Sequence, residues 1–277
     1  MDNSSQIEYW NGPAGQKWVR DADRMDVMLA PFVDAIIASV MPPPGHSVID
    51  IGCGAGALSL NLAASAVNVS VTGVDVSEPL VALARQRSAS VGARIEFVVA
   101  DAAVWRPKEP VDLVISRFGV MFFADPVAAF SNIRACLKPK GRIRFACWRP
   151  VQENLWAFVP MQAAMHLLKT PPAAPPAGTP GPFAFGDPEY LNRILSESGW
   201  VNPSIAPWDG DLTLPGATPE ESADFMLEMG PLSRAIAEQE IDPATVRSAV
   251  VEKLRSLAGE DGRVRLKAAA WIVEAEA

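Results

Sequence analysis

The stretch Val48-Ile49-Asp50-Ile51-Gly52-Cys53-Gly54-Ala55-Gly56-Ala57 decides the fold class of this chain. Apolar residues surround a single acid, and glycine then recurs at every second position. An apolar run of this kind is typical of a strand that is buried on both faces of a parallel sheet. The glycines permit a tight turn and a close approach of the backbone to a ligand. Because open α/β sheets bind ligands at the carboxyl ends of their strands, this turn is the candidate ligand site.

A second acid supports a nucleoside ligand. Asp75 ends the next apolar strand, about 20 residues after the glycine turn, where an acid suits the two hydroxyls of a ribose. Asp50 precedes the first glycine by two residues, where it suits a cationic group such as the amino group of a methionyl chain. A pyrophosphate would not favour an acid there. The pattern therefore favours S-adenosylmethionine over a dinucleotide, with a loop that merely needs small residues as the alternative interpretation.

Composition narrows the class of protein. The 277 residues suffice for one large α/β domain or a domain with a lid. A net charge of −8 disfavours nucleic acid and anionic membrane surfaces as partners. The three cysteines show no metal-ligand spacing, no secretory signal is visible, and no apolar stretch reaches the roughly 20 residues of a membrane span. We expect a cytoplasmic protein without a metal ion that acts on a small molecule, and a homo-oligomer is compatible with the sequence.

Strand and helix signals alternate from Ser47 onward. Regular alternation at this spacing predicts a parallel sheet with right-handed crossovers. Before it, residues 7–25 are too aromatic for a disordered tail, and 31–40 read as an amphipathic helix with Pro31 in its first turn. The expected strands are 47–51, 69–75, 95–99, 111–116 and 141–148, and the expected helices lie near 56–66, 78–91 and 126–137.

The rhythm changes after Trp148. Residues 170–182 are too rich in proline and glycine for regular structure. The remaining expected helices are 153–169, 187–198 and 219–259, and the remaining expected strands are 201–214 and 264–275.

This order of elements resembles the α/β, Rossmann-like fold of class I S-adenosylmethionine-dependent methyltransferases. That fold has a seven-stranded, mostly parallel sheet with an antiparallel last strand, helices on both faces and helical lid insertions. The resemblance covers roughly residues 7–277 and is strongest over 47–150. Within the class, the chain looks most like the bacterial group that resembles ubiquinone/menaquinone biosynthesis C-methyltransferases.

Five segments carry the resemblance. Residues 50–56 look like the first motif, 74–77 like the ribose-binding turn, and Asp101 like the acid that holds the adenine amino group. The loop 116–123 follows the fourth strand. In the turn 137–142 a lysine, Lys140, replaces a usual glycine, which matters only if that residue needs a positive φ.

The resemblance implies a single methyltransferase domain over 1–277. Its parts are an N-terminal helical cap (1–45), a cofactor-binding core (46–150), lid insertions (151–186 and 215–260), and a C-terminal part of the sheet (187–214 and 261–277).

The resemblance also implies two sets of site residues. The residues expected to bind S-adenosyl-L-methionine are Trp10, Trp18, Asp50, Gly52, Cys53, Gly54, Gly56, Asp75, Val76, Asp101, Ala102, Arg117, Phe118 and Met121. The residues expected to line the substrate pocket are Phe122, Trp148, Trp156, Phe183 and Phe185.

Methyl transfer asks mainly for placement, because the sulfonium is already an excellent leaving group. Holding the acceptor in line with the methyl group can supply several kcal/mol, and a base is needed only for an acceptor that must lose a proton early. His166 is the better of two histidines for such a base, although an ordinary position on a helix surface is the favoured interpretation. We expect an apolar or aromatic acceptor and catalysis mainly by proximity and desolvation.

Two alternatives remain from other classes. A dinucleotide-dependent oxidoreductase would share the doubly wound sheet, but Asp50 and Ala57, which stands where a third pyrophosphate-type glycine would be, argue against it. A sensor that binds the nucleoside without catalysis is the second alternative. The sequence identifies neither the substrate nor the acceptor atom.

Overall fold

The computed structural model describes residues 2–89, 91, 94–171, 176 and 178–277. Its centre is a seven-stranded sheet with the order β3-β2-β1-β4-β5-β7-β6. The five strands from β3 to β5 are parallel, and β7 runs antiparallel to both β5 and β6. This confirms the predicted fold class. The strands are β1 (Ser47–Ile51), β2 (Ser70–Asp75), β3 (Arg94–Val99), β4 (Val111–Arg117), β5 (Leu137–Trp148), β6 (Val201–Thr213) and β7 (Arg265–Glu276).

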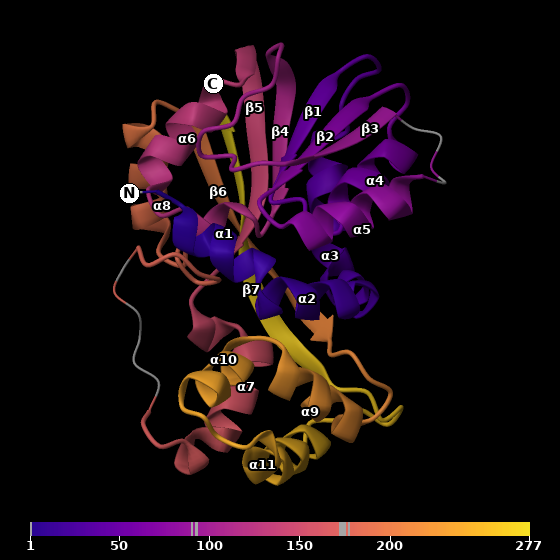
Figure 1. Ribbon diagram of the computed structural model, residues 1–277, viewed down its shortest axis with the longest axis vertical. Helices are drawn as coiled ribbons and strands as arrows, with labels where there is room; N and C mark the ends of the chain where they lie inside the picture. Colours follow the sequence, from indigo (N-terminus) through magenta and orange to yellow (C-terminus); the bar gives the residue numbers. More distant parts are fainter. Residues whose placement is uncertain (1, 90, 92–93, 172–175, 177) are drawn as a thin grey trace.

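Helices surround the sheet and extend beyond it (Figure 1). Three precede β1: α1 (Ser4–Asn11), α2 (Pro13–Arg20) and α3 (Ala22–Val40). Four lie between or beside the sheet strands: α4 (Ala57–Ser65), α5 (Glu78–Ser88), α6 (Pro126–Arg134) and α8 (Pro188–Glu197). Four gather at one end of the molecule: α7 (Leu155–Ala164), α9 (Pro219–Glu228), α10 (Pro231–Glu238) and α11 (Pro243–Arg255). Short 3-10 turns are η1 (Val120–Phe122), η2 (Val151–Glu153) and η3 (Met165–Leu167).

The core explains why the predicted strands form. Residues 48–51 are all buried, as a central parallel strand requires, and Phe32 and Ile36 of α3 are fully buried. The prediction that a helix begins at Pro31 is wrong, because α3 begins at Ala22 and carries Pro31 inside it. The apolar face of this helix starts earlier, at Met25, and its burial outweighs the hydrogen bond that proline cannot donate.

The helical segments after β5 are more broken than predicted. The expected helix 153–169 is split into η2, α7 and η3, and the expected helix 219–259 is split into three. Gly230, with φ +89°, separates α9 from α10, and the Asp242 carboxylate accepts a hydrogen bond from Ala244 N (3.0 Å) at the start of α11. Part of the predicted irregular segment 170–182, namely 172–175 and 177, lies outside the described residues.

Lys140 has φ +65°, in the left-handed region. A residue with a side chain pays roughly 1–2 kcal/mol there, whereas glycine does not. Lys140 lies near the start of β5, where the register with β4 shifts between the pairs Val111–Leu137 and Leu113–Arg142. This irregularity therefore does need the glycine that the resembling family carries, and Lys140 is strained in its place.

Within the part of the chain that the structure describes, no helix combines the length and apolar character needed to cross a membrane.

Candidate functional site

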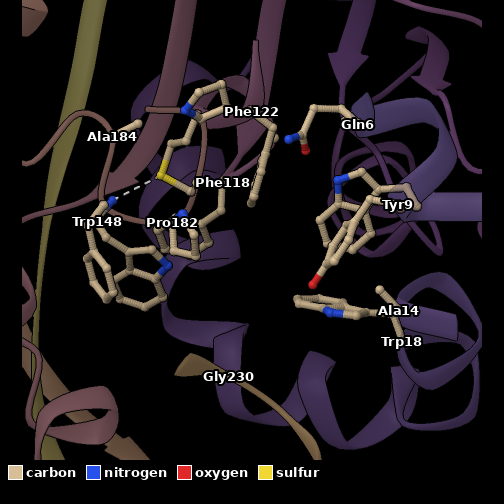
Figure 2. Close-up of a pocket in the computed structure, with 18 of the residues that line it drawn as sticks. Gln6, Tyr9, Ala14, Trp18, Phe118, Phe122, Trp148, Pro182, Ala184 and Gly230 are labelled. Carbon is tan, nitrogen blue, oxygen red and sulfur yellow. Dashed lines mark hydrogen bonds between the residues drawn. The ribbon is translucent and has the colours of Figure 1, made fainter. Parts of the chain in front are cut away.

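A cavity of about 1550 Å³ lies at the carboxyl ends of β1, β2, β4 and β5. Its lining comes from these strand ends, from α1 and α2 on one side, and from α7, α9 and α10 beyond the sheet. Figure 2 shows part of this space, with aromatic side chains on opposite sides of it. The cavity lies at the sheet edge where the glycine turn predicted a ligand site.

The glycine turn is built as its sequence indicates. Gly52 and Gly54 have φ values of +64° and +54°. A Cβ on Gly52 would lie 2.6 Å from the Cα of Gly119, so no larger residue fits where the β1 and β4 loops meet. A Cβ on Gly54 would meet nothing within 4 Å, which leaves the backbone open toward the cavity.

Gly56 corrects one prediction. It does not line the cavity, because a Cβ there would lie 2.9 Å from the ring of Phe97 and 3.2 Å from Ala84. Gly56 precedes α4 and has a φ of +85°. Its small size lets the start of α4 lie close to Phe97 of β3 and Ala84 of α5.

Asp75 organises the turn after β2. One carboxylate oxygen accepts a hydrogen bond from Gly54 N (2.8 Å), and the other accepts one from Ser77 N (2.9 Å). Burial raises the pKa of this carboxyl, and the backbone bonds from Ser77 and Gly54 oppose that rise. Each oxygen has a further lone pair, so the carboxylate can still accept hydrogen bonds from two hydroxyl groups in the cavity.

Asp50 and Arg117 leave polar atoms without partners at the cavity. Asp50 is 1% exposed, and one of its oxygens accepts a hydrogen bond from the Ser59 hydroxyl (2.7 Å). Its Oδ1 and the Nη1 of Arg117 have no hydrogen-bond partner among the described residues. Burial raises the pKa of the Asp50 carboxyl to about 7, against the attraction of Arg117. A buried acceptor and a buried donor without partners are costly, so together they suit a ligand that carries both an ammonium and a carboxylate.

Asp26 of α3 holds the Arg117 guanidinium. The Nη2 of Arg117 lies 3.3 Å from one oxygen of Asp26, and Arg87 donates to the other oxygen at 2.9 Å. The contact between Asp26 and Nη2 orients the Arg117 guanidinium, and Nη1 can still donate a hydrogen bond to a ligand.

Asp101 meets a residue that the sequence did not single out. Asn3 Nδ2 and Ala103 N both donate to its Oδ1, at 2.8 and 2.9 Å. The side-chain oxygen of Asn3 in turn accepts a hydrogen bond from Ala124 N (2.8 Å). An asparagine before a helix reads as an N-cap, but Asn3 makes no capping bond with its side chain. Its partners are distant in sequence, so no local signal reveals them.

The N-terminal helices dock on the turn after β2 through backbone carbonyls. Ser77 Oγ donates to Trp10 O (2.8 Å), and Asn11 Nδ2 donates to Val76 O (2.9 Å). Glu78 N completes the contact by donating to the side chain of Asn11 (2.9 Å). No residue of α1 is buried. Directional polar bonds, together with the contact between the rings of Trp10 and Phe122, therefore hold α1 over the cavity.

Aromatic rings from the ends of β4 and β5, from α7 and from the loop before α8 form one wall of the cavity. Phe118 and Trp148 stack with ring centroids 4.0 Å apart and an interplanar angle of 8°. The ring centroid of Trp156 lies 5.0 Å from that of Trp148, and the ring centroid of Phe183 lies 6.3 Å from that of Trp156. Phe118 has φ +63°, a conformation that costs a bulky residue about 1–3 kcal/mol and that gathers at functional sites. The strained backbone places its ring flat against Trp148.

A second aromatic group comes from the N-terminal helices. Trp10 makes edge-to-face contacts with Tyr9, Trp18 and Phe122, with centroids 5.3 to 5.8 Å apart. Figure 2 shows Tyr9 and Trp18 across the cavity from Phe118 and Trp148. The sequence indicated aromatic residues in both regions, but only the fold shows that they face the same space.

Most of the predicted residues line the cavity. From the cofactor set these are Trp10, Trp18, Asp50, Gly52, Cys53, Gly54, Asp75, Val76, Asp101, Ala102, Arg117, Phe118 and Met121, and from the substrate set Phe122, Trp148, Trp156 and Phe183.

Two further predicted residues lie elsewhere. Phe185 is 2% exposed and packs in the core beside Phe130 and Tyr190, because the loop that carries it turns inward before α8. His166 is an exposed residue of η3 and does not line the cavity. The placement of His166 removes the geometric basis for its candidacy as a base.

Residues 48–141 match the family model described as a methyltransferase domain. This part of the chain is therefore similar to methyltransferase domains, and the sheet order agrees with the predicted Rossmann-like fold.

Three relatives of known name match this part of the chain. Phosphoethanolamine N-methyltransferase 1 of Arabidopsis thaliana is 32% identical over 101 residues, which are 36% of this chain and 20% of the relative. Trans-aconitate 2-methyltransferase of Klebsiella pneumoniae is 33% identical over 96 residues, 35% of this chain and 36% of the relative. Demethylmenaquinone methyltransferase of Thermus thermophilus is 34% identical over 113 residues, 40% of this chain and 51% of the relative. The chain thus spans from a fifth to about half of the length of these relatives.

Solved structures share the fold. The YcgJ protein of Bacillus subtilis aligns with a TM-score of 0.56 and 15% identity, covering 88% of this chain and 97% of that one. Magnesium protoporphyrin IX methyltransferase of Synechocystis, solved with bound S-adenosylhomocysteine, aligns with a TM-score of 0.56 and 22% identity, covering 76% of this chain and 93% of that one.

Proposed function

We propose that this protein transfers a methyl group from S-adenosyl-L-methionine to a small, apolar or aromatic molecule. One observation carries the proposal. Asp50 and Arg117, whose Oδ1 and Nη1 have no hydrogen-bond partner among the described residues, line the same cavity as Asp75 and Asp101. These four groups match the amino, carboxylate, ribose and adenine groups of one ligand. The match to a methyltransferase domain over 48–141 supports the same assignment.

Each polar group has a separate role in the proposed complex. Asp50 accepts from the ammonium of the methionyl part, and Arg117 donates to its carboxylate. Asp75 accepts from the ribose hydroxyls, while Gly54 and Ser77 keep its carboxylate in place. Asp101 accepts from the adenine amino group. When bound, S-adenosylmethionine supplies a methyl group on a positively charged sulfur.

The surrounding residues exclude water and position the acceptor. Stacked Phe118 and Trp148, with Trp156 and Phe183 beside them, form an apolar surface. Neither His46 nor His166 lines the cavity. We therefore propose catalysis through placement and desolvation, without an essential histidine base.

The parts of the domain take roles that follow from this site. We propose that 1–45 act as a cap on the cofactor, that 46–150 bind it, and that 151–186 and 215–260 form a lid over the acceptor. The residues 187–214 and 261–277 complete the sheet. In support, α1 and α2 contribute to the lining on one side and α7, α9 and α10 on the other.

Calorimetry tests the cofactor assignment. S-adenosylhomocysteine should bind to the full chain, and NADH should not. The Asp75→Ala variant should lose most of this affinity, while the control Asp211→Ala should keep it, because Asp211 pairs with Lys267 at the surface and does not line the cavity. Tight binding of NADH with no response to S-adenosylhomocysteine would instead support the oxidoreductase alternative.

A methyl-transfer assay tests the activity. The protein is incubated with methyl-labelled S-adenosylmethionine and a panel of aromatic and apolar metabolites, and label transfer is followed by mass spectrometry. Transfer to a member of the panel supports the enzyme. Cofactor binding without transfer to any acceptor, including those in a cell extract, would favour the sensor alternative.

We also propose a reducing, cytoplasmic compartment and no nucleic-acid partner. All three cysteines are buried and free, and the net charge is −8. Cell fractionation and a gel-shift assay test these two points, and sedimentation velocity tests whether the chain forms a homo-oligomer.

A further inference from the structure

The side chain of Asn3 joins three segments that lie far apart in the chain. Its nitrogen donates to Oδ1 of Asp101 (2.8 Å), in the turn after β3, and its oxygen accepts from Ala124 N (2.8 Å), in the loop before α6. Asn3 is 7% exposed, and both it and Asp101 line the cavity. The Asp101 carboxylate is therefore held by a buried amide that lies 98 residues away in the sequence.

The Asn3 side chain serves these distant partners instead of its own helix. Asn3 precedes α1, and its backbone oxygen accepts hydrogen bonds from Gln6 N and Ile7 N (3.0 and 2.9 Å). An asparagine at this position commonly caps the helix with its side-chain oxygen, but the side chain of Asn3 makes no capping bond. The helix begins without that stabilisation, and the amide is committed to Asp101 and Ala124.

The Asn3 amide restricts how the Asp101 carboxylate can lie. Oδ1 of Asp101 accepts from both Asn3 Nδ2 and Ala103 N, at 2.8 and 2.9 Å. The two donors come from different segments, so the carboxylate cannot turn without bending or breaking one of these bonds. An ionised carboxylate has two acceptor oxygens with roughly four lone-pair sites, so Asp101 keeps the capacity to accept a further hydrogen bond from a ligand in the cavity.

We infer that Asn3 is a positioning residue that fixes the Asp101 carboxylate for the adenine amino group, and that it thereby sets the preference of the site for adenine over a base with a carbonyl oxygen at the same position. The inference rests on the proposed function and gives a role in its cofactor site to a residue outside the predicted set. A fixed carboxylate accepts from an amino group but repels a carbonyl oxygen. A carboxylate released from Asn3 could turn away from that oxygen, so the preference for adenine should shrink.

Two ligands that differ only in the base test this preference. S-adenosylhomocysteine carries the adenine amino group, and S-inosylhomocysteine carries a carbonyl oxygen in its place. By calorimetry, the natural protein should bind S-adenosylhomocysteine at least about tenfold more tightly than S-inosylhomocysteine. Asn3→Ala should weaken S-adenosylhomocysteine binding about three- to fivefold and should reduce the preference between the two ligands at least about threefold. An unchanged preference in Asn3→Ala would overturn the inference.

Asn11→Ala is the matched control for the docking of α1. Asn11 also belongs to α1 and bonds the turn after β2 through Val76 O and Glu78 N, but it has no bond to Asp101 and does not line the cavity. Any loss of affinity in this variant should be equal for the two ligands, so the preference should match that of the natural protein. A preference that falls as far as in Asn3→Ala would overturn the inference, because loosening of the helix would then explain both results.

Asn3→Asp separates the two hydrogen bonds of the amide. The new side chain keeps an oxygen for Ala124 N, but it replaces the donor that faces Asp101 by a second negatively charged acceptor. This variant should bind S-adenosylhomocysteine at least as weakly as Asn3→Ala, because two carboxylates at this distance repel each other. Binding as tight as that of the natural protein would overturn the inference, since the bond to Ala124 alone would then be sufficient.

A double-mutant cycle tests whether Asn3 acts through Asp101. In an Asp101→Ala background, Asn3→Ala should change the affinity for S-adenosylhomocysteine by less than about twofold, because the group that it positions is gone. Independent losses that multiply would overturn the inference and indicate a general structural role. Normal binding of S-adenosylhomocysteine to the natural protein, together with independent losses, would leave the proposed function standing. No binding of S-adenosylhomocysteine to the natural protein would refute both proposals.

Discussion

Replacing Asp50 by asparagine should stabilise the ligand-free protein above neutral pH while weakening cofactor binding. Asp50 is 1% exposed, and burial raises the pKa of its carboxyl from an ordinary value of 3.8 to about 7. Between these two values the folded protein keeps a proton that the unfolded chain has released. The free energy of unfolding therefore falls as the pH rises through this window.

The size of the effect follows from the two pKa values. A pKa difference of one unit corresponds to 1.36 kcal/mol. At pH 8 the raised pKa of Asp50 therefore lowers the free energy of unfolding by about 4 kcal/mol, of which about 1.5 kcal/mol is already lost at pH 5. The Asp50→Asn variant has no charge to bury, and its amide can still bond the Ser59 hydroxyl. Its stability advantage over the natural protein should therefore grow by about 2–3 kcal/mol between pH 5 and pH 8.

Urea unfolding of the ligand-free protein at pH 5, 6, 7 and 8, followed by tryptophan fluorescence, measures this difference. Asp112→Asn is the control with the opposite sign. Burial favours a higher pKa at Asp112, but hydrogen bonds from Lys138 and Ser47 prevail and lower it to about 2. The stability that Asp112 contributes is present above about pH 4 and is lost as the pH falls toward 2, so this variant should differ from the natural protein by a constant amount from pH 5 to 8.

A constant difference for Asp50→Asn across the same range would refute the argument that burial suppresses this charge. The same variant should bind S-adenosylhomocysteine roughly tenfold or more weakly at pH 8, because it loses a charged acceptor worth about 1.5–3 kcal/mol. Unchanged affinity there would separate Asp50 from the cofactor.

Four further predictions concern other parts of the chain. Asp75→Ala should weaken S-adenosylmethionine binding by roughly ten- to a hundredfold, and Asp101→Ala by less, since one adenine contact is lost instead of two ribose contacts; equal losses by calorimetry would contradict these roles. Proteolysis at 12–13, between α1 and α2, should slow when S-adenosylhomocysteine binds, and an unchanged cleavage rate would exclude a cap that orders on the cofactor. His166→Ala should lower the rate of the chemical step by less than roughly tenfold, whereas a thousandfold loss with normal cofactor binding would make it the base. Lys140→Gly should raise the free energy of unfolding by about 0.5–1 kcal/mol in urea, because its φ of +65° suits glycine, and no gain would mean that the turn is not strained.

The sheet and the ligand edge could be predicted from the sequence because their signals are local. An apolar run followed by alternating glycines requires a buried strand and a tight turn wherever it occurs, and Val48–Gly56 adopts both. The strand after it ends in Asp75 for the same local reason. Helix starts with a side-chain acceptor before proline were also readable, as at Asp125, Asp187 and Asp242.

Only the tertiary structure decided which distant residues share the cavity. Asn3 bonds Asp101 and Ala124, and Tyr9 lies across the cavity from Phe118, although nothing in the local sequence links these pairs. Such contacts depend on how separate elements pack, which periodicity and turn chemistry do not encode.

Packing also decided which plausible residues were left out of the site. Phe185 and His166 both lie in the segment that the sequence predicts to form the lid. Phe185 is nevertheless buried in the core, and His166 is exposed and does not line the cavity. The sequence by itself determined the individual strands and the residue types at their carboxyl ends. These features depend on backbone geometry and on buried apolar runs, which act over a few residues. The tertiary structure alone decided the walls of the cavity, because those walls come from helices that are far apart in the chain and meet only in the folded protein.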